Sequence, residues 1–328
     1  MTKNNKEYSF DNFNEKVYLE LYPDVANAIK NGTCKSGFDH YKDFGFKEGR
    51  LLESRKSYFL KLIDERGVGL EIGPSHRPVA PKSENYNCQI LDHLNENDLK
   101  KKYKNHDVNL NNIEKVDYVW DGTPIDKFIG KRGYFNYIIA SHVIEHVPDF
   151  ISFLQSCENL LSVNGVLSLA IPDKRYCFDY YSPITTTGMI IDAFLEKAIK
   201  PSPGRVFDHF SNAAQLENGG AIAWDENSGL DGKELIHTMS QAIDQYSKSI
   251  DIDKYIDCHN WRFVPASFRL LISDLRELKL TNLDIAYEQD TIGHEFFVSL
   301  KINQVSDKNE LSNRVSKLPP VSGYMSAQ

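Results

Sequence analysis

The sequence of 328 residues lacks the features that mark membrane proteins, exported proteins and nucleic-acid-binding proteins. No apolar run approaches the roughly 20 residues of a membrane-spanning helix, and the polar start at residues 1–5 lacks the pattern of a signal peptide. The formal charge of −8, from 46 acidic residues against 38 Lys and Arg, is unfavourable for binding a phosphate backbone. We therefore expect a cytoplasmic protein with no membrane span and no nucleic-acid partner.

Cysteine is also scarce: the chain has five, and no two of them form a C-x-x-C pair. An odd, dispersed set of cysteines is typical of reduced thiols and does not predict a disulfide framework or a zinc-thiolate cluster. The metal-binding motif H-E-x-x-H is absent too, because the glutamate between His142 and His146 stands directly before the second histidine. We therefore expect no metal ion.

A short apolar run at residues 68–72 contains Glu71 and is followed directly by Gly73 and Pro74. The pattern predicts a buried parallel strand that ends at a turn, where Gly73 lets a ligand come close to the backbone. Ligands of open α/β sheets bind beyond the carboxyl end of the first strand. Glu71 is then in position to contact a ligand, and a solvated carboxylate at the strand end is the alternative interpretation.

Three more apolar runs predict neighbouring strands, at residues 87–91, 116–120 and 137–140. Asp92 follows the first of these runs, 19 positions after Gly73, which is the spacing of an acid that accepts hydrogen bonds from a ribose diol. A capping or turn carboxylate is the alternative interpretation. The sequence therefore predicts a nucleoside-binding edge on an open α/β sheet.

The first strand and residues 142–149, which follow the fourth strand, together resemble the class I S-adenosylmethionine-dependent methyltransferases. Glu71 and Gly73 match the family's acidic, glycine-containing first motif, although Pro74 stands in a stretch where the family usually has further glycines. Residues 142–149 match the segment HVxEHxPD of its small-molecule branch. The resemblance implies an α/β fold with a Rossmann-like sheet of seven strands, closed by an antiparallel hairpin, and it implies S-adenosyl-L-methionine as the cofactor.

Residues at the ends of the first four strands are the expected cofactor contacts. The turn after the third strand lies beside the adenine in this family, so the resemblance implies that Asp121 accepts a hydrogen bond from the adenine amino group. The full expected set is Glu71, Gly73, Asp92, Asp121, Gly122, Ser141 and His142.

The remaining periodic segments fit the same domain. Helices are predicted over residues 54–65 and 266–278. A third is predicted to start directly after Asp149, whose side chain is able to cap it. Residues 162–165 predict a turn before a fifth strand. The fifth strand and the two strands of the closing hairpin are expected at residues 166–171, 283–287 and 296–302.

The first 52 residues differ in texture from the rest of the chain. Aromatic and aliphatic residues stand at helical spacing, interrupted by Pro23 and by glycines, which predicts two or three short helices. The motifs Y-P-D-V and H-Y-x-x-x-G-x-x-E-G-R resemble a small helical module found beside glycosyltransferase and methyltransferase domains in bacterial surface-polysaccharide systems. A helical cap on the main sheet or a homo-oligomer contact is the alternative. We expect domains at residues 1–52 and 53–304 and a flexible polar tail at 305–328.

The segment at residues 173–264 interrupts the methyltransferase pattern after the fifth strand. Segments of this length are more often lids or binding elements than spacers. Its aromatic residues, among them Trp224 and Trp261, stand beside carboxylates, a combination that fits a polyhydroxylated acceptor such as a sugar. A small mixed core is the alternative interpretation.

Methyl transfer from a sulfonium to a hydroxyl needs an aligned acceptor oxygen and a base that removes its proton. Histidine is the usual base near neutral pH. We expect His259 in this role because Asp257 and Trp261 flank it in the insertion. His146 lies one helical turn after His142, so a helix there would turn both side chains toward one crevice. The candidate catalytic residues are His259, His146, His209 and Asp173.

Together these patterns predict an S-adenosylmethionine-dependent O-methyltransferase that acts on a hydroxyl of a saccharide or bacterial surface glycan in polysaccharide biosynthesis. The N-terminal module is expected to contact glycan-assembly proteins or a second copy of the chain. One alternative is a NAD-dependent oxidoreductase on a related sheet, but neither its G-x-G-x-x-G turn nor a Tyr-x-x-x-Lys pair is convincing here. The other is a catalytically silent, cofactor-binding interaction protein, which the altered glycine motif favours.

Overall fold

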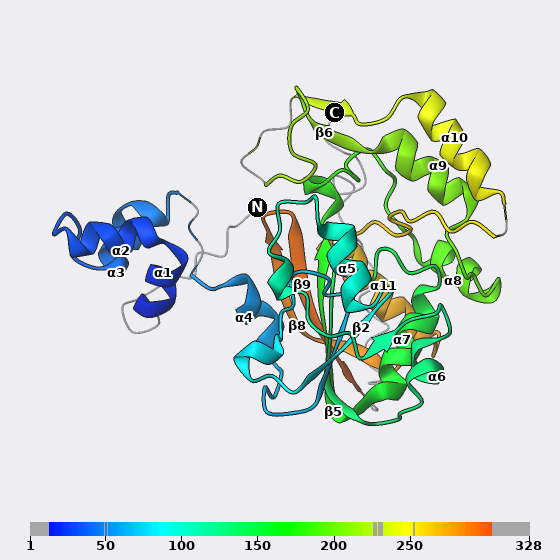
Figure 1. Cartoon of the computed structure of the whole chain (residues 1–328), viewed down its shortest axis with the longest axis horizontal. Helices are drawn as coiled ribbons and strands as arrows, with labels where there is room; N and C mark the ends of the chain where they lie inside the picture. Colours follow the sequence, from blue (N-terminus) through cyan, green and yellow to red (C-terminus); the bar gives the residue numbers. More distant parts are fainter. Residues whose placement is uncertain are drawn as a thin grey trace. The chain divides into compact units, whose positions relative to one another are not determined.

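The computed structural model describes residues 13–48, 50, 52–225, 228, 232–251 and 253–303. The chain divides into two compact units, Met1–Tyr58 and Phe59–Gln328 (Figure 1). The tail expected at residues 305–328 lies outside the described residues, as do residues 1–12 of the expected N-terminal module. The expected domain limits at residues 52 and 304 stay predictions.

In its described residues, the N-terminal unit forms short helices around a small aromatic core. The elements are α1 (Glu15–Leu21), α2 (Pro23–Lys30), α3 (Gly37–His40) and the π-helical turn η2 (Tyr41–Gly45). The Glu15 carboxylate accepts the backbone N–H groups of Gly37 and Phe38 at 2.6 and 3.0 Å, which joins α1 to the start of α3. Tyr18 is completely buried at the centre of this unit. The short helices expected from the sequence are confirmed.

The second unit is built on a sheet of seven strands in the order β3-β2-β1-β4-β5-β9-β8. Neighbouring strands from β3 to β5 are parallel, and β9 runs antiparallel to both β5 and β8. The expected seven-stranded α/β sheet with its closing hairpin is therefore confirmed. The strands are β1 (Gly69–Ile72), β2 (Cys88–Asp92), β3 (Tyr118–Val119), β4 (Phe135–Ser141), β5 (Leu161–Pro172), β8 (Leu283–Ile292) and β9 (Glu295–Ile302).

Parallel pairing brings the carboxyl ends of β1 to β4 to one edge of the sheet, which we call the carboxyl edge. Ile72, at the end of β1, pairs with Leu91 of β2 and with Ala140 of β4. Asp92, at the end of β2, pairs with Val119 of β3. Side chains that follow these four strands therefore emerge next to one another.

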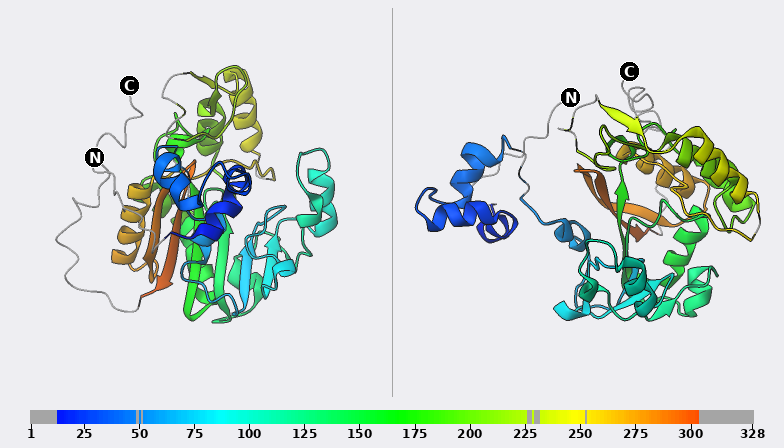
Figure 2. Two further views of the ribbon diagram at one scale, coloured as in Figure 1. Left: turned by 90° about the vertical axis from the view of Figure 1, so that its left-hand side faces the viewer. Right: turned by 45° about the horizontal axis from the view of Figure 1, so that its top comes forward.

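Helices accompany the sheet, and the insertion lies over its carboxyl edge (Figures 1 and 2). The helices of the sheet region are α4 (Arg55–Leu60), α5 (Glu96–Tyr103), α6 (Ile125–Ile129), α7 (Phe150–Leu160) and α11 (Pro265–Glu277). The insertion contributes α8 (Thr187–Leu195), α9 (Pro203–Asn212), α10 (Met239–Ser249) and a two-stranded sheet of β6 (Ala214–Leu216) and β7 (Lys233–Leu235). None of the helices in the described ranges is long and apolar enough to cross a membrane.

Two neighbouring phenylalanines of β9 mark the two faces of the sheet, because successive side chains of a strand point to opposite sides. Phe297 packs edge-on against Phe59 of α4, with ring centroids 5.3 Å apart. Phe296 packs against Phe268 of α11, and Phe268 packs in turn against Phe150 of α7. The core therefore extends over both faces, with α7 and α11 covering the same one.

Two elements are shorter than the sequence predicts. The helix expected over residues 54–65 ends at Leu60, and the chain continues in turns, with hydrogen bonds from the N–H of Ile63 to Leu60 and from the N–H of Gly67 to Asp64. The strand expected over residues 116–120 is reduced to the two residues of β3, Tyr118 and Val119, which pair with Leu91 and Asp92 at the end of β2. Both corrections concern the element ends and leave the order of elements unchanged.

The turn expected at residues 162–165 is part of β5 instead. The pairing between β4 and β5 shifts there, from Phe135 opposite Leu161 to Tyr137 opposite Val166. Unequal numbers of residues between two pairs of a ladder form a bulge, which lets the extra residues stay in the strand.

The two tryptophans expected to face an acceptor are buried. Trp224 packs with Tyr180 and Ala214 in a small cluster, and Trp261 belongs to the main core. For these residues the alternative interpretation, a small mixed core, is therefore the correct one.

Candidate functional site

The Glu71 carboxylate is buried at the carboxyl edge and holds the backbone that follows β1. Its two oxygens accept the N–H groups of Val79 and Ala80 at 2.7 and 3.0 Å. Gly73 has a φ of +64°, and a Cβ at this position would lie 3.1 Å from the Val143 side chain. Glu71 and Gly73 thus shape the turn after the first strand. Their direct contact with a cofactor stays a prediction.

Asp92 joins the end of β2 to the same turn. One oxygen of its buried carboxylate accepts the N–H of Ser75 at 3.1 Å, and the other lies 2.8 Å from the backbone nitrogen and 2.6 Å from Nδ1 of His93. Ser75 is held in the left-handed region, with a φ of +52°. Asp92 is therefore in position to order this edge, and its contact with a ribose stays a prediction.

Two polar atoms of the turn after β1 are buried without a hydrogen-bond partner among the described residues: Oγ of Ser75 and Nδ1 of His76. Buried polar atoms are normally paired, so these two atoms are available to a partner from outside the described residues. The His76 ring packs against Tyr103, with ring centroids 4.8 Å apart, and burial lowers the pKa of His76. Sequence analysis missed both residues, although they directly follow the Gly-Pro turn it had singled out.

The turn after β3 contains the residues expected beside the adenine. Asp121 is exposed and accepts the N–H of Thr123 at 2.9 Å, and this hydrogen bond lowers the pKa of Asp121. Gly122 has a φ of +93°, which favours glycine at this position. The carboxylate faces solvent at the same edge as Asp92, and its contact with a cofactor stays a prediction.

The segment after β4 is not helical, so the expectation of one helical turn between His142 and His146 is wrong. His142, which follows Ser141, has a φ of +53°, a left-handed conformation that breaks any helix. Its Nε2 lies 2.7 Å from the Glu295 carboxylate, and its Nδ1 lies 3.6 Å from Glu145. The cofactor contacts expected for Ser141 and His142 stay predictions.

The structure brings together the three histidines expected to be catalytic, which we call the histidine cluster: His146, His209 and His259. The rings of His146 and His259 meet at 4.7 Å between centroids, and those of His209 and His259 at 6.0 Å. The backbone N–H of His259 donates to Nδ1 of His209 at 3.3 Å. His146 comes from the loop after β4 and the other two from the insertion, so the cluster forms only in the folded chain.

Asp179 and Arg262, both buried, complete the cluster. Nδ1 of His259 lies 2.5 Å from the Asp179 carboxylate, and Nε of Arg262 lies 3.3 Å from its other oxygen. Burial opposes the charge of Asp179, but the charges and hydrogen bond of His259 and Arg262 outweigh it and hold the pKa of Asp179 well below its usual range. Burial lowers the pKa of His209 to about 3, so this imidazole is neutral.

No local pattern marks Asp179, Arg262 or Glu145 as site residues. Asp179 meets His259 across 80 positions of sequence, and no short motif records such a contact. Glu145 was part of the matched segment, but its position between histidines follows only from the fold.

Asp173 lies outside this cluster. Its buried carboxylate accepts both Nε and Nη2 of Arg175 and the hydroxyl of Thr291 at 2.6 Å. Among the described residues no contact joins Asp173 to a cluster histidine. Asp173 therefore links the end of β5 to the turn between β8 and β9, and its catalytic role stays a prediction.

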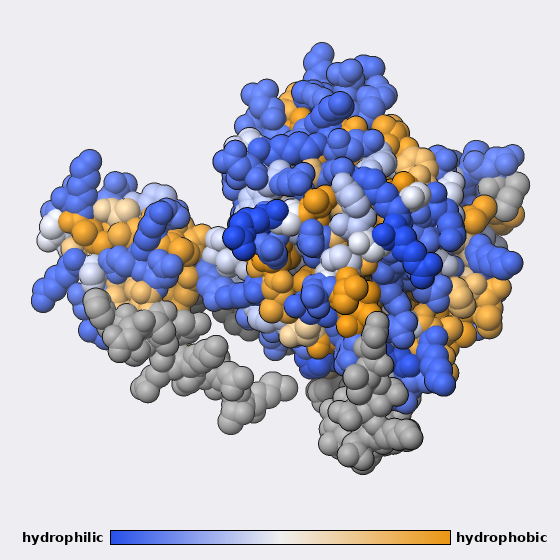
Figure 3. Space-filling model, turned by 90° about the horizontal axis from the view of Figure 1, so that it is seen from below, coloured by the Kyte–Doolittle hydropathy of each residue, from blue (hydrophilic) through white to orange (hydrophobic). Residues whose placement is uncertain are grey.

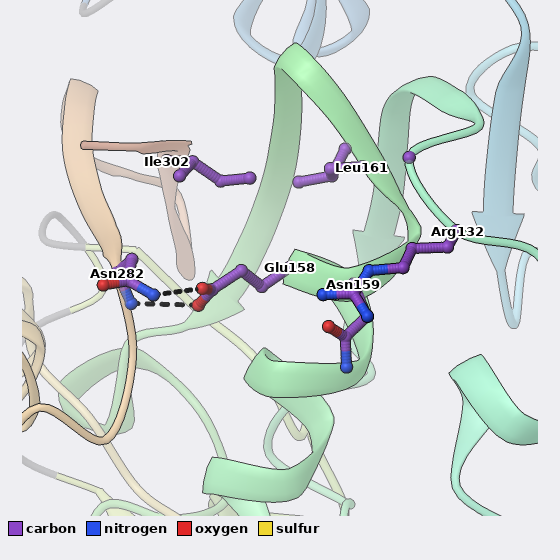
Figure 4. A pocket seen from close by; sticks show the side chains of 7 residues that line it. Arg132, Glu158, Asn159, Leu161, Asn282 and Ile302 are labelled. Atoms are coloured by element: carbon purple, nitrogen blue, oxygen red, sulfur yellow. Dashed lines mark hydrogen bonds between the residues drawn. The ribbon is translucent and has the colours of Figure 1, made fainter. Parts of the chain in front are cut away.

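Two cavities of the second unit have none of the expected cofactor-contact residues in their linings. One of about 420 Å³ lies at the opposite edge, where Glu158 accepts two hydrogen bonds from Asn282 (Figure 4). Seen from below the view of Figure 1, the surface is mostly hydrophilic, with scattered hydrophobic patches (Figure 3). The other, of about 380 Å³, lies between α8 and α9 and is lined in part by Asn260 and Trp261, next to His259. A preformed cofactor hollow between Glu71, Asp92, Asp121 and His142 stays a prediction.

A family model described as methyltransferase domain matches residues 41–218, more than half of the chain. The chain therefore belongs to the methyltransferase-domain family. It is an S-adenosylmethionine-dependent methyltransferase built on a Rossmann-like sheet of seven strands. Among curated proteins, none matches the chain.

Solved structures give distant similarities. A Rhodobacter sphaeroides protein, described provisionally as a zinc-dependent alcohol dehydrogenase, is 14% identical, with 76% of this chain and 88% of that chain covered and a TM-score of 0.42. The methyltransferase CcbJ from Streptomyces caelestis is 10% identical, with 76% and 93% covered and a TM-score of 0.39. The trans-methyltransferase CalH, solved with SAH, is 13% identical, with 73% and 52% covered and a TM-score of 0.35. The strand order and the family match, rather than these similarities, define the fold.

Proposed function

We propose that this methyltransferase transfers the methyl group of S-adenosylmethionine to a hydroxyl of a saccharide or bacterial surface glycan. The observation that carries the proposal is the buried pair of His259 and Asp179, 2.5 Å apart, over the carboxyl edge of the sheet. A carboxylate on Nδ1 fixes the orientation of an imidazole and stabilises its protonated form, which suits it to accept a proton from an alcohol.

The reaction breaks the bond between sulfur and methyl and forms a bond between methyl and the acceptor oxygen. The hydroxyl proton must leave as this bond forms, and we assign its removal to the histidine cluster, with His259 as the candidate base. His146 is also held by a carboxylate, since its Nδ1 lies 2.9 Å from Asp257. His209 stays neutral and partly buried, and it supports the backbone of His259.

We propose the carboxyl edge as the cofactor site. The unpaired polar atoms of Ser75 and His76 fit a ligand with hydrogen-bonding groups, because both atoms are buried in the turn whose Ser75 N–H donates to Asp92. The buried carboxylates of Glu71 and Asp92 hold the turn around them. S-adenosylmethionine supplies the activated methyl group, and the residues of this edge orient it toward the histidine cluster.

The acceptor class rests on two features of the chain. One is the resemblance of the N-terminal motifs to modules of surface-polysaccharide systems. The other is the polar and aromatic surface of the insertion, where Tyr181 and Tyr255 are exposed. Exposed tyrosine rings offer an apolar face to sugar C–H groups and a hydroxyl to sugar hydroxyls.

We propose that the N-terminal unit binds a glycan-assembly protein or a second copy of the chain. Phe44 and Phe46 are more than half exposed on this unit, and exposed aromatic side chains are common at protein contacts. All five cysteines are free, which fits a reducing compartment such as the cytoplasm.

The test is a transfer assay with a panel of saccharides and glycan fragments, read by mass spectrometry as the gain of one methylene mass. We expect methylation of at least one saccharide hydroxyl, with S-adenosylhomocysteine as the second product. Binding of S-adenosylmethionine without turnover on any hydroxyl acceptor would support the catalytically silent alternative. Transfer to an amine or a carbon acceptor alone would contradict O-methylation.

A further inference from the structure

Glu145 is a buried carboxylate that lacks a hydrogen bond. Its side chain is 1% exposed, and neither oxygen has a hydrogen-bond partner among the described residues. The nearest basic groups are Nδ1 of His142 at 3.6 Å and Nε2 of His259 at 3.9 Å, both too distant for a hydrogen bond. A buried, unpaired carboxylate is strongly unfavourable, so this position calls for a positively charged partner.

Two histidines share the surroundings of this carboxylate. The ligand-capable atoms of Glu145, His146 and His259 all lie within 4.8 Å of one another. The two rings are perpendicular, with an interplanar angle of 89° and centroids 4.7 Å apart. Glu145 and His259 are buried, and His146 is partly exposed. An ion bound between the three side chains would therefore be open to solvent on the side of His146.

Each of these histidines is held at its other nitrogen by a second carboxylate. Nδ1 of His146 lies 2.9 Å from Asp257, and Nδ1 of His259 lies 2.5 Å from Asp179. Both imidazoles therefore keep Nε2 for another partner. A carboxylate on the far nitrogen is the usual arrangement of a metal-bound histidine, because it fixes the tautomer and orients the ring.

We propose that Glu145, His146 and His259 bind a divalent metal ion, and zinc fits this set of ligands best. Two histidines and one carboxylate are a ligand set of catalytic zinc sites, in which a fourth position stays open. With metal–ligand distances of about 2.0–2.2 Å, tetrahedral ligand atoms lie about 3.4 Å apart. The 3.9 Å between Glu145 and His259 is close to this separation.

A neighbouring group, His142, His294 and Glu295, is a weaker candidate. Its carboxylate already lies 2.7 Å from Nε2 of His142, so it has a partner. The motif search of the sequence missed the proposed site because His259 comes from the insertion, far from the adjacent pair of Glu145 and His146.

The open position gives the metal a role that rests on the proposed function. A cation held by these residues would lower the pKa of a hydroxyl bound at its open position, and the hydroxyl proton would then leave to solvent as the methyl group moves from sulfur to oxygen. His259 then acts as a ligand instead of accepting the proton directly. Direct proton transfer to His259 and proton loss from a metal-bound hydroxyl involve the same residues. They differ in whether methyl transfer needs a metal ion.

The experiment is calorimetric titration of Zn²⁺ into the full chain after treatment with a chelator, with Co²⁺ as a second probe whose absorption spectrum reports its coordination. We expect one ion per chain and a four-coordinate Co²⁺ spectrum. Glu145→Gln should abolish binding. Asp257→Asn, which removes only the carboxylate behind His146, should weaken it by about 10- to 100-fold. The matched control is His294→Ala, from the neighbouring group, which should bind Zn²⁺ like the wild type.

No Zn²⁺ binding by the wild type, or equal binding by Glu145→Gln and the wild type, would overturn the site. Asp257 is largely exposed, so its variant decides the question even if Glu145→Gln does not fold. Metal binding without methylation of any hydroxyl acceptor would support the site while the proposed function fails. Equal transfer rates with and without metal would overturn the role in acidifying the acceptor and leave direct proton transfer to His259.

Discussion

Nδ1 of His259 lies 2.5 Å from Oδ2 of Asp179, and both of these insertion side chains are buried. Asp179 also lies 3.3 Å from Nε of Arg262, so this carboxylate orients an imidazole and balances a buried guanidinium at once. The arrangement makes Asp179 the residue on which the geometry of the histidine cluster depends.

Asp179→Asn should therefore slow methyl transfer by about 100-fold or more, because the amide no longer orients or stabilises the imidazole of His259. Binding of S-adenosylhomocysteine should stay unchanged. The measurement is the transfer rate at saturating cofactor. Asp244→Asn, on the exposed face of α10, is the control and should transfer at the wild-type rate. A wild-type rate in Asp179→Asn would show that His259 needs no partner.

The same substitution should lower stability, because it leaves Arg262 buried without a charged partner. Breaking a buried ion pair costs about 3–5 kcal/mol, whereas loss of the exposed pair of Asp244 costs at most about 1 kcal/mol. Denaturant unfolding of the two variants checks the difference. Equal midpoints would mean that Arg262 finds another partner.

Gly69 allows β1 and β4 to pair closely. A Cβ at this position would lie 2.0 Å from the Tyr137 ring, which is itself fully buried. Gly69→Ala should destabilise the second unit by about 1–3 kcal/mol through overpacking. Gly188→Ala is the matched control, because its Cβ would meet only Oγ1 of Thr186 at 3.8 Å and because alanine favours the helix. Thermal unfolding should separate the two variants, and equal midpoints would contradict the packing.

The two oxygens of Glu71 accept hydrogen bonds from two backbone N–H groups. A glutamine side chain accepts with its one oxygen only, because its other terminal group is an NH2 donor. Glu71→Gln should loosen the turn after β1 and weaken binding of S-adenosylhomocysteine by about 10-fold. Glu96→Gln, which removes a carboxylate on the surface of α5, should leave the affinity unchanged. Calorimetric titration checks both variants, and an unchanged affinity in Glu71→Gln would show that this turn does not shape the cofactor site.

Tyr18 predicts a pH dependence for the N-terminal unit. Burial raises its pKa from 10.0 to about 12, so the unfolded chain loses the phenolic proton at a lower pH than the folded unit does. The stability contributed by this group is complete below pH 10.0 and is lost as the pH rises to about 12. Tyr18→Phe should flatten this loss in pH-dependent unfolding followed by circular dichroism. A slope identical to that of the wild type would contradict the burial of the hydroxyl.

Local patterns predicted the parts of the fold that depend on local chemistry. Gly73 and Asp92 stand at strand ends that the apolar runs and turns had marked, and the seven-stranded sheet with its closing hairpin followed from the family resemblance. Asp149 accepts the N–H of Ser152 at 2.9 Å and caps α7 as expected.

Local sequence patterns could not predict the contacts between side chains within the site. Asp179 and Glu145 come close to His259 only in the folded chain. These residues lie far from His259 in the sequence, so no short motif predicts the contacts. His142 and His146 were expected to lie one helical turn apart, but the left-handed backbone of His142 ends any helix at this residue. Trp224 was expected to face an acceptor and instead fills a small core, because aromatic residues serve either purpose.

The central claim is a division of labour: the carboxyl edge binds the cofactor, and the histidine cluster acts on the acceptor. The direct measurement is calorimetric titration of S-adenosylhomocysteine into the wild type, Asp92→Ala and His259→Ala, with the exposed Asp107→Asn as a control. The account predicts an affinity loss of about 10-fold or more for Asp92→Ala and wild-type affinity for His259→Ala. Loss of affinity in His259→Ala with full affinity in Asp92→Ala would contradict it.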